Sequence, residues 1–266
     1  MHYGIQLFGA KALFRQNPRA FLEKTAAMGY EFIEPGVQVG PFSGMPQAHR
    51  DGLWKPEEYP QFMAQMRELG LRSVSCHVFA DDLPGAVPAM LRIRDQVGVS
   101  AFVVNPGGST QAECEARAGA FNQVTLALKQ EGAQLLLHNS GDSSYEKTAD
   151  GRSLYEEVLR LCPDMGAQLD TGWALWGGED PLTVAVRLGP RMKSLHIKEM
   201  ARGFAGRQGV DRFAVLGEGV TQLPPLLKLA GEAMPVIVDQ DVAFRGFFDD
   251  FERTMAALRA AEAQID

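Results

Sequence analysis

The segment Gln168-Leu169-Asp170-Thr171-Gly172-Trp173 decides the fold, because an apolar run delivers a carboxylate and a glycine then breaks the extended chain. A second run, Ser194-Leu195-His196-Ile197-Lys198-Glu199, follows about one helix length later and places a histidine near its end. Ionisable groups at the ends of buried strands are what an α/β-barrel enzyme presents to its substrate. We therefore start from the hypothesis that Asp170 and His196 share a metal ion.

Short apolar runs and helical segments alternate eight times along the chain, which suits a parallel sheet covered on both faces. The expected strands cover residues 3–8, 31–34, 71–78, 101–104, 134–138, 165–170, 192–197 and 235–239. The expected helices cover residues 18–28, 56–69, 83–97, 110–130, 153–161, 181–189, 223–230 and 246–266. This pattern predicts a (β/α)8 TIM barrel that takes up residues 1–266 as a single domain. An open doubly wound sheet is the alternative, but no G-x-G-x-x-G follows the first strand.

The composition narrows the classes of function. The formal net charge is -7 and no Lys/Arg-rich run occurs, which argues against a nucleic-acid surface. No apolar stretch approaches the roughly 20 residues that span a bilayer, so we expect no membrane partner. The first residues do not read as a signal peptide, and the three cysteines form no C-x-x-C motif. The simplest expectation is a cytoplasmic protein.

Six ionisable side chains stand at the ends of the expected strands: Glu34, His77, His138, Asp170, His196 and Asp239. The carboxyl ends of barrel strands converge on one face, so these groups predict one shared polar site. A mixed set of imidazoles and carboxylates suits Mn²⁺, Zn²⁺, Mg²⁺ or Co²⁺. Such a metal would polarise a substrate carbonyl, and a neighbouring carboxylate could then move a proton.

The chain resembles the sugar phosphate isomerase/epimerase family of xylose isomerase-like barrels, which also includes endonuclease IV-type enzymes and inosose dehydratases. The resemblance covers essentially the whole chain and rests mainly on Leu137-His138-Asn139, Leu169-Asp170-Thr171-Gly172-Trp173, Gly178-Glu179-Asp180-Pro181, Leu195-His196-Ile197-Lys198-Glu199, Leu216-Gly217-Glu218-Gly219-Val220 and Val238-Asp239-Gln240-Asp241.

The resemblance implies a metal held at the ends of the fifth to eighth strands, by Glu, Asp, His and Glu in the epimerases. Asp170 and His196 match the two middle positions, and His138 and Asp239 occupy the outer two. In epimerases the two outer glutamates also transfer the proton, so both of these departures affect the expected chemistry. The resemblance makes Asp239 the first candidate for the base, with His138 able to act with it because imidazole titrates near neutrality. The alternative is a metal that is bound weakly or not at all.

Further residues are expected to contact the substrate. Lys198 joins Asp239 and His138 in the expected catalytic set, because it resembles a lysine that contacts substrate oxygens in relatives; the alternative is a lysine that pairs with a carboxylate at the rim. Glu34, His77, Trp173 and Glu199 complete the expected substrate-binding set, although Glu34 could instead anchor the following loop. His77 matches one of the extra histidines of the DNA-repair branch. Trp173 replaces another of them, which argues against abasic-site cleavage.

Three aromatic residues outside this set, Phe14, Phe42 and Trp54, are expected on loops over the same face. They would close a lid over the substrate or seat a neighbouring subunit. The superfamily commonly forms dimers or tetramers, so a homo-oligomer is left open.

The leading expectation is a metal-dependent isomerase or epimerase that acts on a sugar, a sugar phosphate or a polyol-derived ketone. An inosose-type dehydratase needs the same metal and the same proton removal but expels a hydroxyl group. A degenerate barrel that binds a sugar without turnover is the third possibility, because both outer ligand positions are altered.

Overall fold

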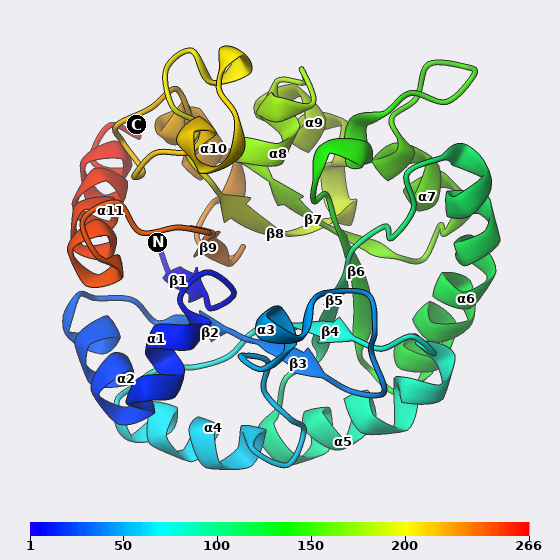
Figure 1. Cartoon of the computed structure of the whole chain (residues 1–266), viewed down its shortest axis with the longest axis horizontal. Coiled ribbons are helices and arrows are strands. Elements are labelled where there is room, and N and C mark those ends of the chain that lie inside the picture. Colours follow the sequence, from blue (N-terminus) through cyan, green and yellow to red (C-terminus); the bar gives the residue numbers. More distant parts are fainter. Residues whose placement is uncertain (266) are drawn as a thin grey trace.

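Short buried apolar runs form a cylinder of parallel strands at the centre of the computed structural model, with helices around the outside (Figure 1). The structure describes residues 1–265, apart from the side chains of Asp142 and Ser143. Within them, nine strands are paired in the order β2-β1-β9-β8-β7-β6-β5-β4-β3. Their bounds are β1 (Tyr3–Gln6), β2 (Phe32–Glu34), β3 (Gly36–Gln38), β4 (Ser75–Phe79), β5 (Ala101–Val104), β6 (Gln134–His138), β7 (Gly166–Asp170), β8 (Met192–Ile197) and β9 (Val236–Val238).

The second strand position of the barrel is divided at Pro35 into two short strands, β2 and β3. β2 pairs with β1, and β3 pairs with β4. The backbone of Ile33 donates to the carbonyl of Arg72 at 2.8 Å, just before β4, and the His77 amide donates to the Pro35 carbonyl at 2.9 Å. These bonds bring the two ends of the sheet together, so the predicted eightfold barrel is confirmed. Between the expected strand at residues 31–34 and the expected helix at residues 56–69 the chain also contains β3, which the sequence analysis did not include.

Helices cover the outer face of the barrel between successive strands. Their bounds are α1 (Lys11–Gln16), α2 (Pro18–Ala27), α3 (Gln47–Arg50), α4 (Tyr59–Glu68), α5 (Val87–Val97), α6 (Gln111–Gln130), α7 (Leu154–Leu161), α8 (Thr171–Trp176), α9 (Pro181–Leu188), α10 (Leu223–Ala230) and α11 (Phe247–Glu262). Several begin at capping residues: the Asn17 side chain accepts from the Ala20 amide, and Thr110 forms a capping box with Glu113.

The main core lies between the sheet and these helices, and a small separate cluster of Ala101, Val103 and Leu136 lies apart from it. Phe14 and Trp54 belong to the main core, with ring centroids 5.2 Å apart. The prediction that these two form a lid is therefore wrong, because burial of their large apolar surfaces fixes them beneath the loops. Within residues 1–265, none of the helices combines the length and apolar character needed to cross a lipid bilayer.

Candidate metal and substrate site

The strand ends bring the predicted ionisable groups together at the centre of the barrel. The imidazole centroids of His77 and His138 are 5.0 Å apart, and those of His138 and His196 are 4.8 Å apart. All three rings are buried. The strand-end positions that the sequence singled out therefore do share one site, and Glu34, Asp170 and Asp239 lie in it as well.

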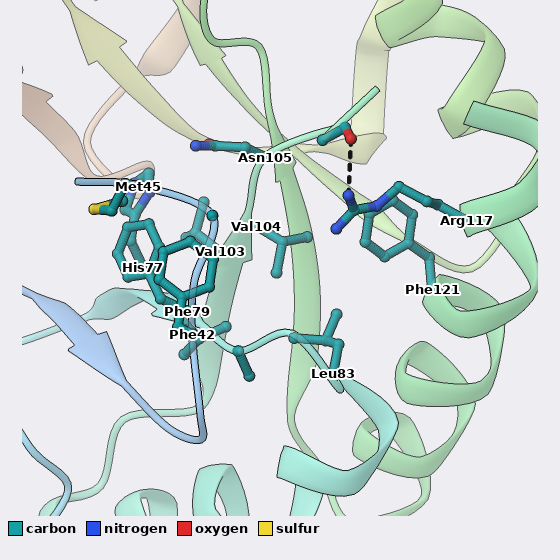
Figure 2. Close-up of a pocket in the computed structure, with 14 residues that line it drawn as sticks. Phe42, Met45, His77, Phe79, Leu83, Val103, Val104, Asn105, Arg117 and Phe121 are labelled. Carbon is teal, nitrogen blue, oxygen red and sulfur yellow. Dashed lines mark hydrogen bonds between the residues drawn. The ribbon is translucent and has the colours of Figure 1, made fainter. Parts of the chain in front are cut away.

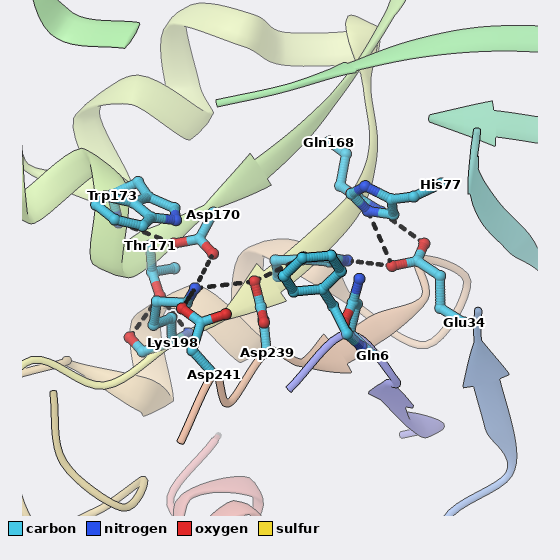
Figure 3. A network of polar contacts seen from close by, with 12 residues as sticks. Gln6, Glu34, His77, Gln168, Asp170, Thr171, Trp173, Lys198, Asp239 and Asp241 are labelled. Carbon is cyan, nitrogen blue, oxygen red and sulfur yellow. Dashed lines mark hydrogen bonds and ion pairs between the residues drawn. The ribbon is translucent and has the colours of Figure 1, made fainter. Parts of the chain in front are cut away.

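Glu34 stands at the centre of a network of donors, and its side chain has no exposed surface (Figure 3). Its Oε2 accepts from His196 Nε2 at 2.6 Å and lies 3.3 Å from His77 Nε2. Its Oε1 accepts from Gln168 Nε2 at 2.9 Å and from the Ser75 hydroxyl. Burial opposes ionisation, but the two imidazoles outweigh it and hold the pKa of Glu34 well below its usual value. Glu34 thus influences the site indirectly, through the side chains that donate hydrogen bonds to its carboxylate.

The contact with Glu34 fixes which ring nitrogen of His196 carries a proton and which one faces the candidate metal ligands. An ionised carboxylate only accepts hydrogen bonds, so His196 Nε2 carries the proton. Burial lowers the pKa of His196, yet the carboxylates of Glu34 and Asp239 raise it to about 10. His196 Nδ1 faces Asp239 Oδ2 at 3.6 Å, which is longer than a hydrogen bond. A cation that binds at Nδ1 would therefore replace the second proton of the ring.

Four residues could hold a metal ion together: His138, Asp170, His196 and Asp239, with ligand atoms all within 4.8 Å of one another. His138 Nδ1, Asp170 Oδ2 and His196 Nδ1 are buried, and each lacks a hydrogen-bond partner among the described residues. Unsatisfied buried polar atoms are rare and need an explanation. Three from one cluster fit a divalent cation, because imidazole and carboxylate are its usual ligands.

The electrostatics of two of these residues also suit a cation. Burial raises the pKa of Asp170 to about 7, which shows how poorly the metal-free site solvates this carboxylate. Burial, together with the neighbouring imidazole of His196, holds the pKa of His138 well below its usual value. A neutral imidazole is the form that binds metals.

Lys198 places an ammonium group beside this set, and only 3% of its side chain is exposed. Its Nζ lies 2.7 Å from Asp241 Oδ2, 3.0 Å from Asp239 Oδ2 and 3.7 Å from Asp170 Oδ2 (Figure 3). Burial disfavours the charged amine, but the three carboxylates raise its pKa above the usual value. The ammonium of Lys198 offsets one of the three carboxylate charges around it, so these three carboxylates keep two net negative charges that can face a divalent cation.

Two residues that the sequence analysis did not assign to the site hold its members in place. Asn139 clamps the backbone of Asp170: its Nδ2 donates to the carbonyl at 2.8 Å, and its Oδ1 accepts from the amide at 2.7 Å. Gln168 joins His77 to Glu34, because its Oε1 lies 3.0 Å from His77 Nε2. Residues two apart point to the same face of a strand, so the polar pair Gln168 and Asp170 was a usable signal.

A cavity of about 170 Å³ opens over this cluster, lined by Gln6, Phe8, Met45, His77, Phe79, Asn105, His138, Ser140, Trp173, Asp239 and Asp241. Two of the predicted substrate contacts, His77 and Trp173, thus line open space, together with the predicted proton-transfer groups His138 and Asp239. Glu199 does not line it. Its carboxylate accepts from the backbone amides of Met200, Gly217, Val220 and Thr221, and so anchors the loop after β8.

Gly172 lets the Lys198 side chain pass close to α8. A Cβ at position 172 would lie 2.6 Å from Lys198 Cγ and 2.9 Å from its Cβ. We expect Gly172→Ala to displace Lys198 and to lower the free energy of unfolding by about 1–3 kcal/mol, measured by urea denaturation.

Gly119→Ala is the matched control, because a Cβ at that position in α6 meets no atom within 4 Å. A glycine replaced inside a helix should raise stability by about 0.5–1 kcal/mol. Equal stability changes in the two variants would contradict the crowding at Gly172.

Solved structures with the same architecture lie close to this chain in shape. A sugar phosphate isomerase/epimerase from Parabacteroides distasonis ATCC 8503 superposes with a TM-score of 0.76 at 18% identity, covering 97% of this chain and 96% of the other. D-psicose 3-epimerase from Clostridium cellulolyticum H10, solved with D-tagatose, gives 0.65 at 12% identity, covering 100% of both chains. The IolI protein with a bound zinc atom gives 0.67 at 14% identity, covering 99% and 97%.

At these identities the likeness concerns the fold. No curated protein sequence matches the chain. The family model described as "Xylose isomerase-like TIM barrel" matches residues 22–234, which include most of the strands and all of the candidate ligands except Asp239. The chain therefore belongs to the xylose isomerase-like TIM barrel family.

Proposed function

We propose that the protein is a metal-dependent isomerase or epimerase that removes a proton next to the carbonyl group of a sugar-like substrate. The observation that carries this proposal is the convergence beside a cavity of three buried atoms, on His138, Asp170 and His196, that have no hydrogen-bond partner within residues 1–265. The bound zinc of IolI and the D-tagatose of the psicose epimerase support a metal and a sugar on this fold.

His138, Asp170, His196 and Asp239 would hold the metal, whose chemistry is to polarise the substrate carbonyl and stabilise negative charge on its oxygen. Glu34 keeps His196 oriented with Nδ1 toward the site. Trp173 supplies an apolar wall of the cavity, while Gln6 and Asn105 offer amide groups to substrate hydroxyls.

Asp239 and His138 are the candidate proton-transfer groups, because both line the cavity. Lys198 keeps Asp239 ionised: although burial opposes it, the ammonium holds the pKa of that carboxyl well below its usual value. The base takes the proton from the carbon next to the carbonyl, which leaves an enediolate. Return of the proton to the other face of the same carbon gives the epimer. Its return to the former carbonyl carbon, with the hydroxyl proton moving to the other oxygen, gives the isomer.

Metal loading and deuterium exchange test this proposal together. Protein stripped with EDTA and reloaded with Mn²⁺ or Zn²⁺ should bind one ion per chain by elemental analysis. Free ion at 100 times its Kd should add about 2.7 kcal/mol to the stability of the folded chain, seen as a rise in Tm. In D2O, a panel of ketoses should include one that gains deuterium next to its carbonyl without losing water.

Loss of water from the product would instead identify the dehydratase reaction. Absence of stoichiometric metal, with no change in Tm, would contradict the metalloenzyme and leave a sugar-binding barrel.

A further inference from the structure

A second cavity of about 310 Å³ lies beside the metal and substrate site (Figure 2). It is bounded by the ends of β4 and β5, by α6, and by the loop that follows β3. Its walls are mostly carbon, with Phe42, Phe79, Leu83, Val104 and Phe121 around it. The Phe42 and Phe79 rings pack with their centroids 5.4 Å apart.

The two cavities adjoin, because Met45, His77, Phe79 and Asn105 line both of them. The cavity over the candidate metal ligands is the smaller and carries the ionisable groups, His138, Asp239 and Asp241. Aromatic and aliphatic side chains make up most of the lining of the larger one, while Phe8 and Trp173 add aromatic walls to the smaller one. We call the smaller cavity the polar compartment and the larger one the apolar compartment. A ligand that spans both would have one end beside the ionisable groups and the other among aromatic and aliphatic side chains.

The size of the apolar compartment indicates what it could hold. A dry cavity of about 150 Å³ is enough to bind benzene, so about 310 Å³ has room for an aromatic ring or a branched alkyl group. Three polar side chains line this compartment, His77, Asn105 and Arg117, and Asn105 lies where the two cavities adjoin. His77 Nε2 already contacts Gln168 Oε1 at 3.0 Å, and Arg117 at the far end donates to the Gly107 carbonyl at 2.8 Å. Sugar hydroxyls placed in this compartment would exchange water for carbon, which is unfavourable.

We propose that the natural substrate is a hydroxy-carbonyl compound that carries an aromatic or branched alkyl substituent, with its carbonyl in the polar compartment and its substituent in the apolar one. This inference rests on the proposed function for the position of the carbonyl. It replaces a simple sugar as the substrate class with an amphipathic one.

A pair of ketones that differ only in the substituent tests the substrate class. The probes are 1-hydroxy-4-phenylbutan-2-one and 1-hydroxybutan-2-one, with Mn²⁺-loaded protein in D2O and exchange followed by proton NMR. A single methylene in an apolar pocket is worth about 10-fold or more in kcat/KM, so the phenyl ketone should exchange at least about 10-fold faster in kcat/KM. Equal kcat/KM values, or a preference for the smaller ketone, would overturn the inference.

Variants place that preference in the cavity. Leu83→Trp fills the apolar compartment and should reduce the preference to less than about threefold. Leu126→Trp, the same change at a residue of α6 that is 49% exposed, should leave the preference as in the wild type. If Leu83→Trp does not fold, as judged by circular dichroism, Phe42→Ala removes one wall from a loop and should lower the preference as well. A preference unchanged in the folded variants would overturn the assignment.

A binding measurement separates this inference from the proposed function. Fluorine NMR of 4-fluorobenzyl alcohol reports occupancy of an apolar cavity whether or not any ketone reacts. We expect line broadening with the wild type and with Leu126→Trp, and its loss with Leu83→Trp. If neither of these ketones nor any ketose of the panel exchanges, the proposed function fails, and this pattern of broadening still supports the cavity as a site for an aromatic group. Absence of broadening with the wild type would overturn the assignment of this cavity as a site for an aromatic group.

Discussion

Asp170→Asn should abolish the rise in Tm that Mn²⁺ or Zn²⁺ gives the wild type and slow carbonyl-linked deuterium exchange by about 1,000-fold. Loss of a carboxylate ligand removes one of the two charges that match a divalent cation, and charge stabilisation by a metal is worth several kcal/mol. The substitution preserves the start of α8, since Asp170 Oδ1 accepts from the Trp173 amide at 2.8 Å and an asparagine oxygen can do the same. The metal-free variant should therefore fold.

The stability of this variant without metal is a second readout. The Asp170 carboxylate is fully buried, and its Oδ2 has no hydrogen-bond partner in the described chain. Removal of a poorly solvated charge should leave the free energy of unfolding within about 1 kcal/mol of the wild type, or raise it. The control is Asp180→Asn, which changes the exposed cap of α9 and should keep the full metal response. A normal metal response in Asp170→Asn would show that this carboxylate is not a ligand.

Glu34→Gln should lower the free energy of unfolding by about 3–5 kcal/mol, because it leaves the buried partners of a buried charge unpaired. Donors from Ser75, Gln168 and His196 all point at the Glu34 carboxylate. A glutamine would turn an NH2 group toward some of them, so that donor would face donor. Urea denaturation of the metal-free variant measures the loss.

The same substitution should weaken metal binding by about 10–100-fold, the range found when the hydrogen-bond partner of a ligand histidine is removed. Without the Glu34 charge, His196 is free to carry its proton on Nδ1 and is then unable to bind a cation there. Glu31→Gln is the matched control, since that residue precedes β2 and pairs with His2 and Arg72 at the surface. It should change stability by less than about 1 kcal/mol. Similar effects of the two substitutions would contradict the central place of Glu34.

Much of the barrel could be predicted from the sequence, because the signals were local. Expected strands of four to eight residues, separated by expected helices, fixed the order of the elements, and the helices capped by Asn17 and Thr110 begin where they were expected. The short helix α8 was missed because the signal at its start was interpreted as the end of a strand. Asp170 does end β7, but its side chain also caps the next helix.

The candidate site could also be predicted from the sequence only in part. The convergence of His77, His138 and His196 follows from their equivalent places at strand ends, which the sequence shows. The pairing of each carboxylate with a particular imidazole depends on the angles between neighbouring strands, and no local sequence pattern encodes those angles. The contact of Glu34 with His196 joins residues 162 positions apart, and Lys198 reaches three carboxylates, one at the end of β7 and two just after β9. The pocket walls were unpredictable for a further reason, since Phe14 and Phe42 look alike in sequence and only one is core.

The break at Pro35 has a consequence for how this scaffold could diversify. Pro35 divides one strand position of the barrel into β2 and β3. The position of Glu34 is therefore fixed by the pairing of β2 with β1, whereas the position of the chain beyond Pro35 is fixed by the pairing of β3 with β4. The loop that carries Phe42 and Met45 is thus attached to its own short strand. Insertions or exchanges in that loop can reshape the apolar compartment while the groups that would do the chemistry keep their places. Grafting this loop from other barrels is therefore a natural route to altered substrate range.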